Sequence, residues 1–219
     1  MGCEINVSII MDKYGNKTKV KRELIIATRN KGKFSEIVEG LKDLPLEFFS
    51  LDDRKEIPQG FSVLETASTF EGNAILKAMT IGKMTSILTL SDDSGLEVDA
   101  LGGRPGVLSA RYVQGTDEDR FRKLLEEMKD APDEKRGAQF HAVIALYDPA
   151  TERVRTCEGI CRGVITREPQ GNGGFGYDPI FYHEGLGKTI AQMSLEEKNR
   201  ASHRGFALQG VRKVLAQDF

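Results

Sequence analysis

Residues 87–95 read Ile-Leu-Thr-Leu-Ser-Asp-Asp-Ser-Gly, an apolar run followed by two adjacent carboxylates. Such a run predicts a buried strand whose carboxyl end carries Asp92 and Asp93, at the edge where open α/β sheets bind ligands. Because side chains alternate along a strand, only one carboxylate is expected to face a cleft. Mg²⁺ with phosphate would compensate the paired charges, whereas an ordinary Asp-Asp-Ser-Gly turn is the alternative.

The composition is that of a globular protein. The chain has 219 residues, of which 39% are hydrophobic and 29% charged, and a net charge of -2. This length allows one large domain or two small lobes. The charge balance predicts neither a nucleic-acid nor a membrane partner, so any phosphate site must be local. Without a bilayer-length apolar stretch or a basic signal-peptide start, we expect a cytoplasmic protein whose three cysteines, Cys3, Cys157 and Cys161, stay reduced and pack.

The first 22 residues differ from the rest of the chain. Ile5 to Met11 predict a strand, Tyr14-Gly15-Asn16 a turn, and residues 17–22 a basic connector. This N-terminal extension is either a short appended hairpin or a weakly ordered leader before a later start such as Met11. We expect residues 23–219 to form a single domain.

A second buried strand is predicted at Leu24–Ala27, followed by the polar turn Thr28-Arg29-Asn30-Lys31-Gly32-Lys33 and a helix that reaches about Lys42. Backbone N–H groups and lysines at the start of a helix can cradle a phosphate. The turn lacks the Walker A pattern, and a solvated basic turn is the alternative.

Ser68-Thr69-Phe70-Glu71 has the pattern of a capping box, which predicts the start of another helix. Asn73 and Lys77 lie one turn apart at the edge of its apolar stripe, where the lysine could reach into a cleft. Glu65 comes just before this helix. Each of these three would be an ordinary surface residue if it stood alone.

The second half of the chain predicts a mixed sheet. Alternation at residues 96–100 predicts an exposed edge strand, and residues 117–129 predict a helix. Two long strands, residues 140–147 and 153–165, are joined by a turn at 148–151. Since such a hairpin is antiparallel, the sheet cannot be purely parallel.

Residues 171–176 fit the pattern G-x-G-x-x-G, but they run into Tyr177-Asp178-Pro179 rather than into a helix. We therefore reject a dinucleotide-binding fold. The aromatic side chains could stack on a flat ring, and Asp178 could accept from a ring N–H, although a flexible loop with a core Phe175 is the alternative. Farther on, Lys198, His203 and Arg204 gather hydrogen-bond donors near the start of the last helix.

Together these stretches supply donors for phosphates, carboxylates for Mg²⁺ and stacking for a base, the inventory for a nucleoside triphosphate. No Ser or Cys nucleophile with a partnered His is evident in the sequence, so metal-assisted attack by water is the expected chemistry.

The sequence resembles the inosine triphosphate pyrophosphatase family, also called Ham1. The matching stretches keep the order of the family from about residue 24 onward: residues 27–33, 69–78, 92–96, 105–106, 109–112, 173–179, Lys198 and 202–204. Arg29 departs from the pattern, because many members carry glycine there, and the first 22 residues lie outside it.

The resemblance implies a two-lobed α/β fold, with a long mixed central sheet flanked by helices and an active-site cleft between the lobes. It also implies a homodimer that uses Mg²⁺ to hydrolyse non-canonical purine triphosphates (ITP, dITP, XTP and dXTP) to the monophosphate and pyrophosphate, cleansing the nucleotide pool.

Residue roles follow from the same resemblance. Asp93 is the implied catalytic carboxylate and Mg²⁺ ligand, with Glu65 as a second metal-linked carboxylate and Asp92 in support. The implied substrate-binding residues are Thr28, Asn30, Lys31, Gly32, Lys33, Lys77 and Ser94 around the phosphates, Phe175, Gly176, Tyr177 and Asp178 around the base, and Lys198, His203 and Arg204 as readers of the 6-oxo group.

Two other hypotheses compete with this interpretation. A Maf-type pyrophosphatase would act on modified or pyrimidine nucleotides, but the stretches at residues 175–178 and 202–204 argue against it. A nucleotide-binding or regulatory module would keep the pocket without turnover. The retention of Asp93, Glu65 and Lys77 argues against that module.

Overall fold

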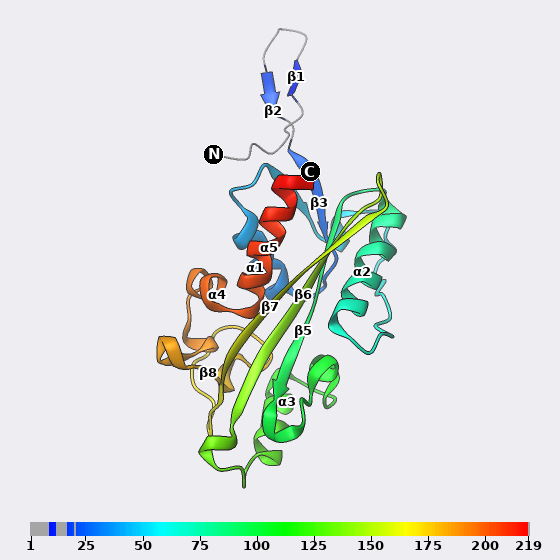
Figure 1. Cartoon of the computed structure of the whole chain (residues 1–219). Helices are drawn as coiled ribbons and strands as arrows, with labels where there is room; N and C mark the ends of the chain where they lie inside the picture. Colours follow the sequence, from blue (N-terminus) through cyan, green and yellow to red (C-terminus); the bar gives the residue numbers. More distant parts are fainter. Residues whose placement is uncertain (1–8, 12–16, 20, 219) are drawn as a thin grey trace.

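The computed structural model describes residues 9–11, 17–19 and 21–218 and is built on a seven-stranded mixed sheet (Figure 1). The strands lie in the order β4-β3-β5-β6-β7-β8-β9. The first three pair in parallel and the later ones antiparallel, which confirms the predicted mixed sheet. Their bounds are β3 Arg22–Ile26, β4 Leu46–Phe49, β5 Thr89–Val98, β6 Gly137–Asp148, β7 Arg153–Ile165, β8 Phe181–His183 and β9 Lys188–Thr189.

Strand β5 corrects the prediction that the strand ends at the two aspartates. It continues to Val98, so Asp92 and Asp93 lie inside the strand rather than at its end. The reason is its partner: β6 pairs with β5 over the whole length, and this ladder satisfies the backbone groups beyond the two aspartates. The parallel neighbour β3 reaches only Thr89 and Leu90.

The separate exposed edge strand predicted at residues 96–100 is also wrong. Residues 96–98 are the second half of β5, and Leu96 and Val98 are fully buried. Residues 99–101 form a short 3-10 helix instead. Alternation of apolar and charged residues does not show whether a strand is separate, and here residues 96–98 pair with β6 as a continuation of β5.

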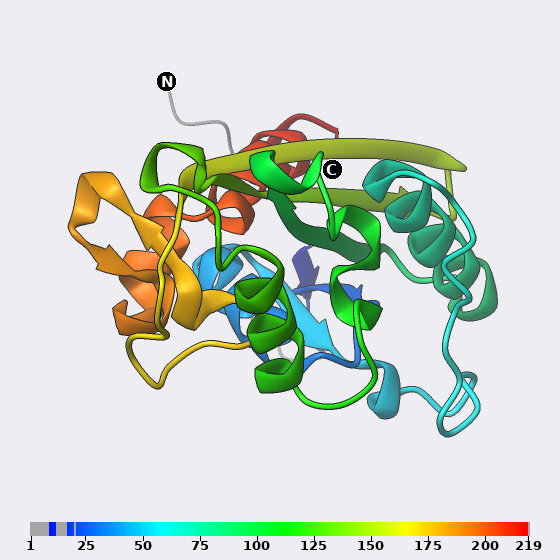
Figure 2. The ribbon, with the colours of Figure 1, turned by 90° about the horizontal axis from the view of Figure 1, so that it is seen from below.

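In the described part of the chain, five α-helices flank the sheet: α1 Lys31–Leu41, α2 Phe70–Thr85, α3 Asp117–Glu127, α4 Leu195–Ala201 and α5 His203–Asp218. Helices α1, α4 and α5 lie on one side of the long strands and α2 on the other (Figure 1). Seen from below, α2 and α4 again lie on opposite sides of the molecule (Figure 2). Within the described residues, no helix has the length and apolar character needed to cross a membrane.

The start of α2 differs in detail from the predicted capping box. The N-cap is Thr69, whose hydroxyl accepts from the Gly72 N–H at 3.1 Å, rather than Ser68. The third helical residue is therefore a glycine, which has no side chain to return the hydrogen bond. The helix begins at Phe70, within one residue of the predicted position.

The two largest apolar clusters of the described residues mark two lobes. Leu90 belongs to a core between the sheet and helices α1 and α5, and Leu96 belongs to a second core beside α3. Strands β5 and β6 are long enough to contribute to both. The aspartates at 92 and 93 thus stand on β5 where one core gives way to the other, which positions the candidate site.

The described part of the N-terminal extension forms a two-stranded antiparallel sheet. Strand β1 (Ile9–Met11) pairs with β2 (Lys17–Lys19), and the choice between a hairpin and a leader for the whole extension stays a prediction. The residues predicted as a basic connector include β2 and the first residue of β3. The predicted turn at 14–16, the strand residues 5–8 and Cys3 lie outside the described residues.

Candidate active site

Asp92 and Asp93 point to opposite faces of β5, as the alternation of a strand requires. Asp92 faces α1 and α5, where Lys33 and Arg204 contact it. Asp93 faces α2, where Asn73 and Lys77 contact it. One strand therefore carries two different carboxylate environments back to back.

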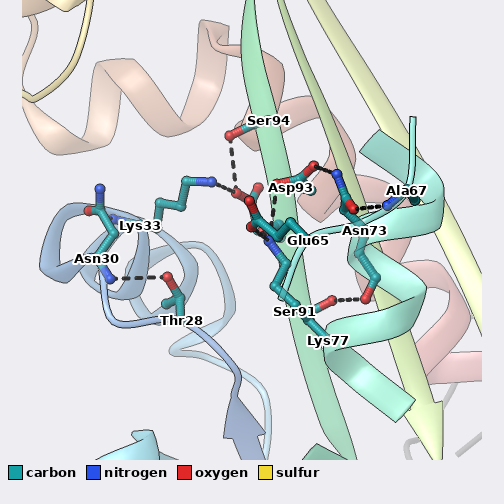
Figure 3. A network of polar contacts seen from close by, with 12 residues as sticks. Thr28, Asn30, Lys33, Glu65, Ala67, Asn73, Lys77, Ser91, Asp93 and Ser94 are labelled. Carbon is teal, nitrogen blue, oxygen red and sulfur yellow. Dashed lines mark hydrogen bonds and ion pairs between the residues drawn. The ribbon is translucent and has the colours of Figure 1, made fainter. Parts of the chain in front are cut away.

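On the Asp93 face, helix α2 presents Asn73 and Lys77 one turn apart (Figure 3). The Asn73 amide donates to Asp93 Oδ2 at 3.2 Å. Lys77 Nζ lies 3.0 Å from Asp93 Oδ1 and 2.7 Å from Glu65 Oε1, and it donates to the Asp92 carbonyl at 2.8 Å. The combination predicted from Glu65, Asn73 and Lys77 is therefore brought together by the fold.

The carboxylates around Lys77 have pKa values that move in opposite directions. Burial raises the pKa of Asp93, the nearby Glu65 charge adds to the rise, and Lys77 opposes it. Burial alone would raise the pKa of Glu65 as well, but Lys77, Lys33 and Arg111 together lower it below its usual value. Two neighbouring carboxylates whose pKa values are shifted in opposite directions suit a site in which one of them accepts a proton.

The carboxylates of Glu65 and Asp93 both contact the ammonium group of Lys77. Mg²⁺ is commonly held by one or two protein carboxylates together with substrate phosphates and water, so these two oxygens fit such an ion. Within the described residues, no group of three or more His, Cys, Asp or Glu side chains is arranged to hold a metal. Asp92, the third predicted metal residue, is turned toward the opposite face of β5.

On the other face of β5, the carboxylate of Asp92 forms ion pairs with two cationic side chains. Lys33 Nζ lies 2.7 Å from Asp92 Oδ2, Arg204 Nε lies 3.1 Å from Oδ1, and the Ser94 hydroxyl donates to Oδ2 at 3.1 Å. Burial would raise the pKa of Asp92, but Arg204 and Lys33 hold it well below its usual range. Burial lowers the pKa of Lys33 even though Asp92 opposes this change.

A buried carboxylate that the sequence reasoning missed, Glu36, extends this network. Its Oε1 lies 2.6 Å from Lys198 Nζ, and its Oε2 pairs closely with Arg204 Nη1. Lys198 also lies 2.6 Å from Asp178 Oδ2. The spacing in the sequence could have indicated that Glu36 belongs to this network. It comes one helical turn after Lys33 and next to the apolar residue Ile37.

The glycine-rich loop brings Phe175 over the cationic network. The Lys198 ammonium lies 4.5 Å and the Arg204 guanidinium 5.7 Å from the centre of the Phe175 ring, a cation–π arrangement. The loop does not open an α-helix, in agreement with the rejection of a dinucleotide fold; a 3-10 turn at Asp178–Ile180 and strand β8 follow it.

The backbone of this loop is fixed by two aspartates. Asp178 Oδ2 accepts from the Phe175 N–H at 2.9 Å, and Asp117 Oδ2 accepts from the Gly176 N–H at 2.7 Å. Tyr177 is buried, and its hydroxyl donates to the Ser109 carbonyl at 3.0 Å. Asp117, at the start of α3, is a further residue that sequence reasoning missed.

His203 is buried beside the same loop, and its ring stacks on Phe140 with centres 4.7 Å apart. Burial lowers the pKa of His203 well below its usual value, and Arg204 lowers it further, so the imidazole is neutral at pH 7. Among the described residues, its Nδ1 has no hydrogen-bond partner. A buried polar atom in this state is available to a ligand.

The polar turn before α1 is preorganised by its own side chains. Asn30 caps the helix by accepting from the Lys33 N–H at 3.0 Å, and Thr28 accepts from the Asn30 N–H at 3.2 Å. Lys31 is exposed. A side-chain carbon at Gly32 would lie only 2.3 Å from Phe175 Cδ1, so glycine is needed there for the aromatic ring to approach the turn.

Two cavities meet at this turn. One, of about 240 Å³, is lined by residues of the polar turn together with Glu65 and Lys77. The other, of about 230 Å³, is lined by Phe175, His203 and Arg204. Both share Asn30, Lys33 and Ala110, so an elongated ligand with an anionic end and a flat ring fits the pair. A larger cavity of about 640 Å³ around His141 contains none of the predicted site residues.

The fold and site therefore define a class: α/β proteins whose two adjoining cavities are lined by cationic and aromatic side chains. The sequence pattern of the Ham1 family matches residues 24–214. The chain belongs to the Ham1 family, which confirms the resemblance seen in the sequence.

Relatives with known names are similar over most of the chain. A dITP/XTP pyrophosphatase from Escherichia coli K12 is 47% identical over 86% of this chain and 95% of its own length. Another from Geobacter sulfurreducens is 48% identical over 84% of this chain and 92% of its own. A solved HAM1 protein from Coxiella burnetii is 42% identical, with a TM-score of 0.79, over 90% of this chain and 99% of that one. The Staphylococcus aureus Ham1 structure is 38% identical, with a TM-score of 0.78, over 90% and 100%.

Proposed function

We propose that this chain hydrolyses deaminated purine nucleoside triphosphates (ITP, dITP, XTP and dXTP) to the monophosphate and pyrophosphate. The similar proteins from Escherichia coli and Geobacter sulfurreducens are named for action on dITP and XTP. The observation that carries the proposal is the meeting of two cavities at Asn30 and Lys33, one lined by the Glu65–Lys77 pair and the other by Phe175.

In this proposal the triphosphate lies in the cavity beside the polar turn. Asn30, Lys33 and Lys77 line that cavity, and the N–H groups at the start of α1 lie next to it. The first N–H groups of a helix have no partner within the helix and favour anions. Lys77 then exchanges part of its contact with Glu65 and Asp93 for contact with phosphate oxygens.

Asp93 is the proposed general base. It takes a proton from water as the water oxygen bonds to phosphorus and the bond to the pyrophosphate leaving group breaks, so the monophosphate and pyrophosphate are released. Burial and the Glu65 charge, which raise the pKa of Asp93, make it a better proton acceptor than an exposed aspartate. Glu65 and Asp93 would hold Mg²⁺, which supplies charge neutralisation at the phosphates when it is bound.

The purine ring lies over Phe175 in the second cavity. His203 and Arg204 line this cavity, and Lys198 contacts the Phe175 ring. Cationic or neutral N–H donors directed at O6 accept hypoxanthine or xanthine and leave donors unpaired opposite the amino group of adenine. A site built for one hydrogen bond can reject the analogue that lacks it by roughly 10⁴-fold.

Pyrophosphate release from ITP, dITP, XTP, GTP and ATP with Mg²⁺ tests the function. We expect fast release from the first three and slow release from GTP and ATP. Preference for a pyrimidine or methylated nucleotide would instead support a Maf-type enzyme, and binding without turnover would support a regulatory module. The homodimer and the cytoplasmic location stay predictions, which gel filtration with light scattering and cell fractionation can check.

A further inference from the structure

The segment that carries Glu65 has no regular secondary structure. Residues 61–67, here called the Glu65 segment, lie between the 3-10 turn at Leu51–Asp53 and helix α2. Their exposure alternates: Phe61, Val63 and Glu65 face inward, whereas Leu64 is 78% exposed. Phe61 and Val63 pack on an apolar cluster, so Glu65 is the next inward position of an extended chain.

Side chains from elsewhere in the chain hold this segment at both ends. At its downstream end, Asn73 accepts from the Ala67 N–H at 2.9 Å. At its upstream end, Arg29 Nε donates to the Phe61 carbonyl at 2.9 Å. Arg111 adds longer contacts of 3.3 Å to the Glu65 backbone and carboxylate.

We infer that Arg29 is a positioning residue that sets the location of Glu65 relative to Asp93. Arg29 belongs to the polar turn of the phosphate cavity, and its contact with Phe61 fixes the backbone four residues before Glu65. A shift of one residue in an extended chain would turn Glu65 outward, because inward and outward positions alternate. This role rests on the proposed function, since Glu65 matters through the metal that it would share with Asp93.

The contact geometry requires an arginine. Arg29 uses Nε for the Phe61 carbonyl and Nη1 for Asp52, which lies 2.6 Å away. The planar guanidinium makes both contacts at once, whereas the single ammonium of lysine cannot reproduce this fork. Asp52 is largely exposed, so its ion pair contributes little by itself and serves as an internal control.

Limited proteolysis with chymotrypsin tests the positioning without any nucleotide, because Leu64 is an exposed cleavage site next to Glu65. Loss of one hydrogen bond should raise the cleavage rate after Leu64 by roughly threefold to tenfold in both Arg29→Gly and Arg29→Lys. Asp52→Asn should stay within about twofold of wild type, because the Phe61 contact remains. Melting temperatures of all three variants check that the fold is intact.

The Mg²⁺ dependence of ITP hydrolysis supplies the functional readout. In both Arg29 variants the Mg²⁺ concentration for half-maximal rate should rise by roughly threefold to tenfold, while KM for ITP at saturating Mg²⁺ changes less than about twofold. Unchanged cleavage in Arg29→Gly, or full recovery of both readouts in Arg29→Lys, would overturn the inference. If wild type hydrolyses none of the nucleotides, the proposed function fails, and the proteolysis still decides whether Arg29 holds the segment.

Discussion

The two faces of β5 hold neighbouring carboxylates in opposite situations. Asp92 is buried between Arg204, which is also buried, and Lys33, whose side chain is 16% exposed, and its pKa is held well below the usual range. Asp93 has one shared cation, an amide partner and a raised pKa. The comparison teaches that adjacency in sequence does not imply a shared role, because successive side chains of a strand point to opposite faces of the sheet.

On the Asp92 face, a network of buried ion pairs lies beneath the ring of Phe175, which lines the proposed base cavity. Glu36, Asp92 and Asp178 neutralise Lys33, Lys198 and Arg204, and Phe175 lies over two of these cations. The Asp93 face has fewer cations, and Glu65 and Lys77 beside Asp93 line a cavity that Asp92 also lines. We therefore expect substitutions on the first face to affect stability and substrate selection, and those on the second to affect turnover.

The largest effect is expected for Asp93→Asn. This change removes the proton acceptor while keeping the shape of the side chain, so the rate of pyrophosphate release from ITP should fall by about 10²- to 10⁴-fold. Urea unfolding should show a well-folded variant, because Lys77 keeps its partner Glu65. A variant with near wild-type turnover would remove the functional distinction between the two faces.

Asp92→Ala should instead act on stability. It leaves the guanidinium of Arg204 and the ammonium of Lys33 without a shared partner in a buried site, which costs about 3–5 kcal/mol in the free energy of unfolding. Asp99→Ala is the matched control, since its ion pair with Arg162 is exposed and contributes at most about 1 kcal/mol. Equal losses in the two variants would show that Asp92 is not structural.

Gly32→Ala tests the contact between the polar turn and Phe175. The added methyl group would lie 2.3 Å from the ring, so the ring must shift, at a cost of about 1–3 kcal/mol. We expect KM for ITP to rise more than kcat falls, because the displaced ring lies on the base cavity. Ser35→Ala, on an exposed position of the same helix, should change neither constant.

The smallest effect is a pH dependence from His203. Because the folded protein keeps this imidazole neutral, the unfolded chain binds one more proton below its usual pKa of about 6.5. Stability should therefore fall as the pH drops from about 7 to 5, by up to about 1.4 kcal/mol per pH unit from this group.

His203→Asn should flatten that slope in urea unfolding measured at several pH values, even if the loss of stacking on Phe140 lowers stability at every pH. An unchanged slope would mean that His203 titrates alike in both states. The Asp92 network would then have to tolerate an additional buried charge.

Much of the fold could be predicted because its signals are local. The hairpin of β6 and β7, helices α1, α3 and α5 and the mixed sheet follow from apolar periodicity and turn residues. The end of β5 was misplaced because two aspartates resemble a turn in sequence, while the pairing partner that keeps them in the strand lies about fifty residues farther along the chain.

The candidate site divides in the same way. The sequence by itself determined the family, the candidate ligand chemistry and the side chains grouped along short motifs, because these depend on residue type and spacing. Only the tertiary structure decided that Glu36 and Asp117 contact the candidate site, that Asp92 faces away from Asp93, and that Arg29 contacts the Glu65 segment. Those contacts join distant segments, and burial, which sets charge and pKa, exists only once these segments are packed together.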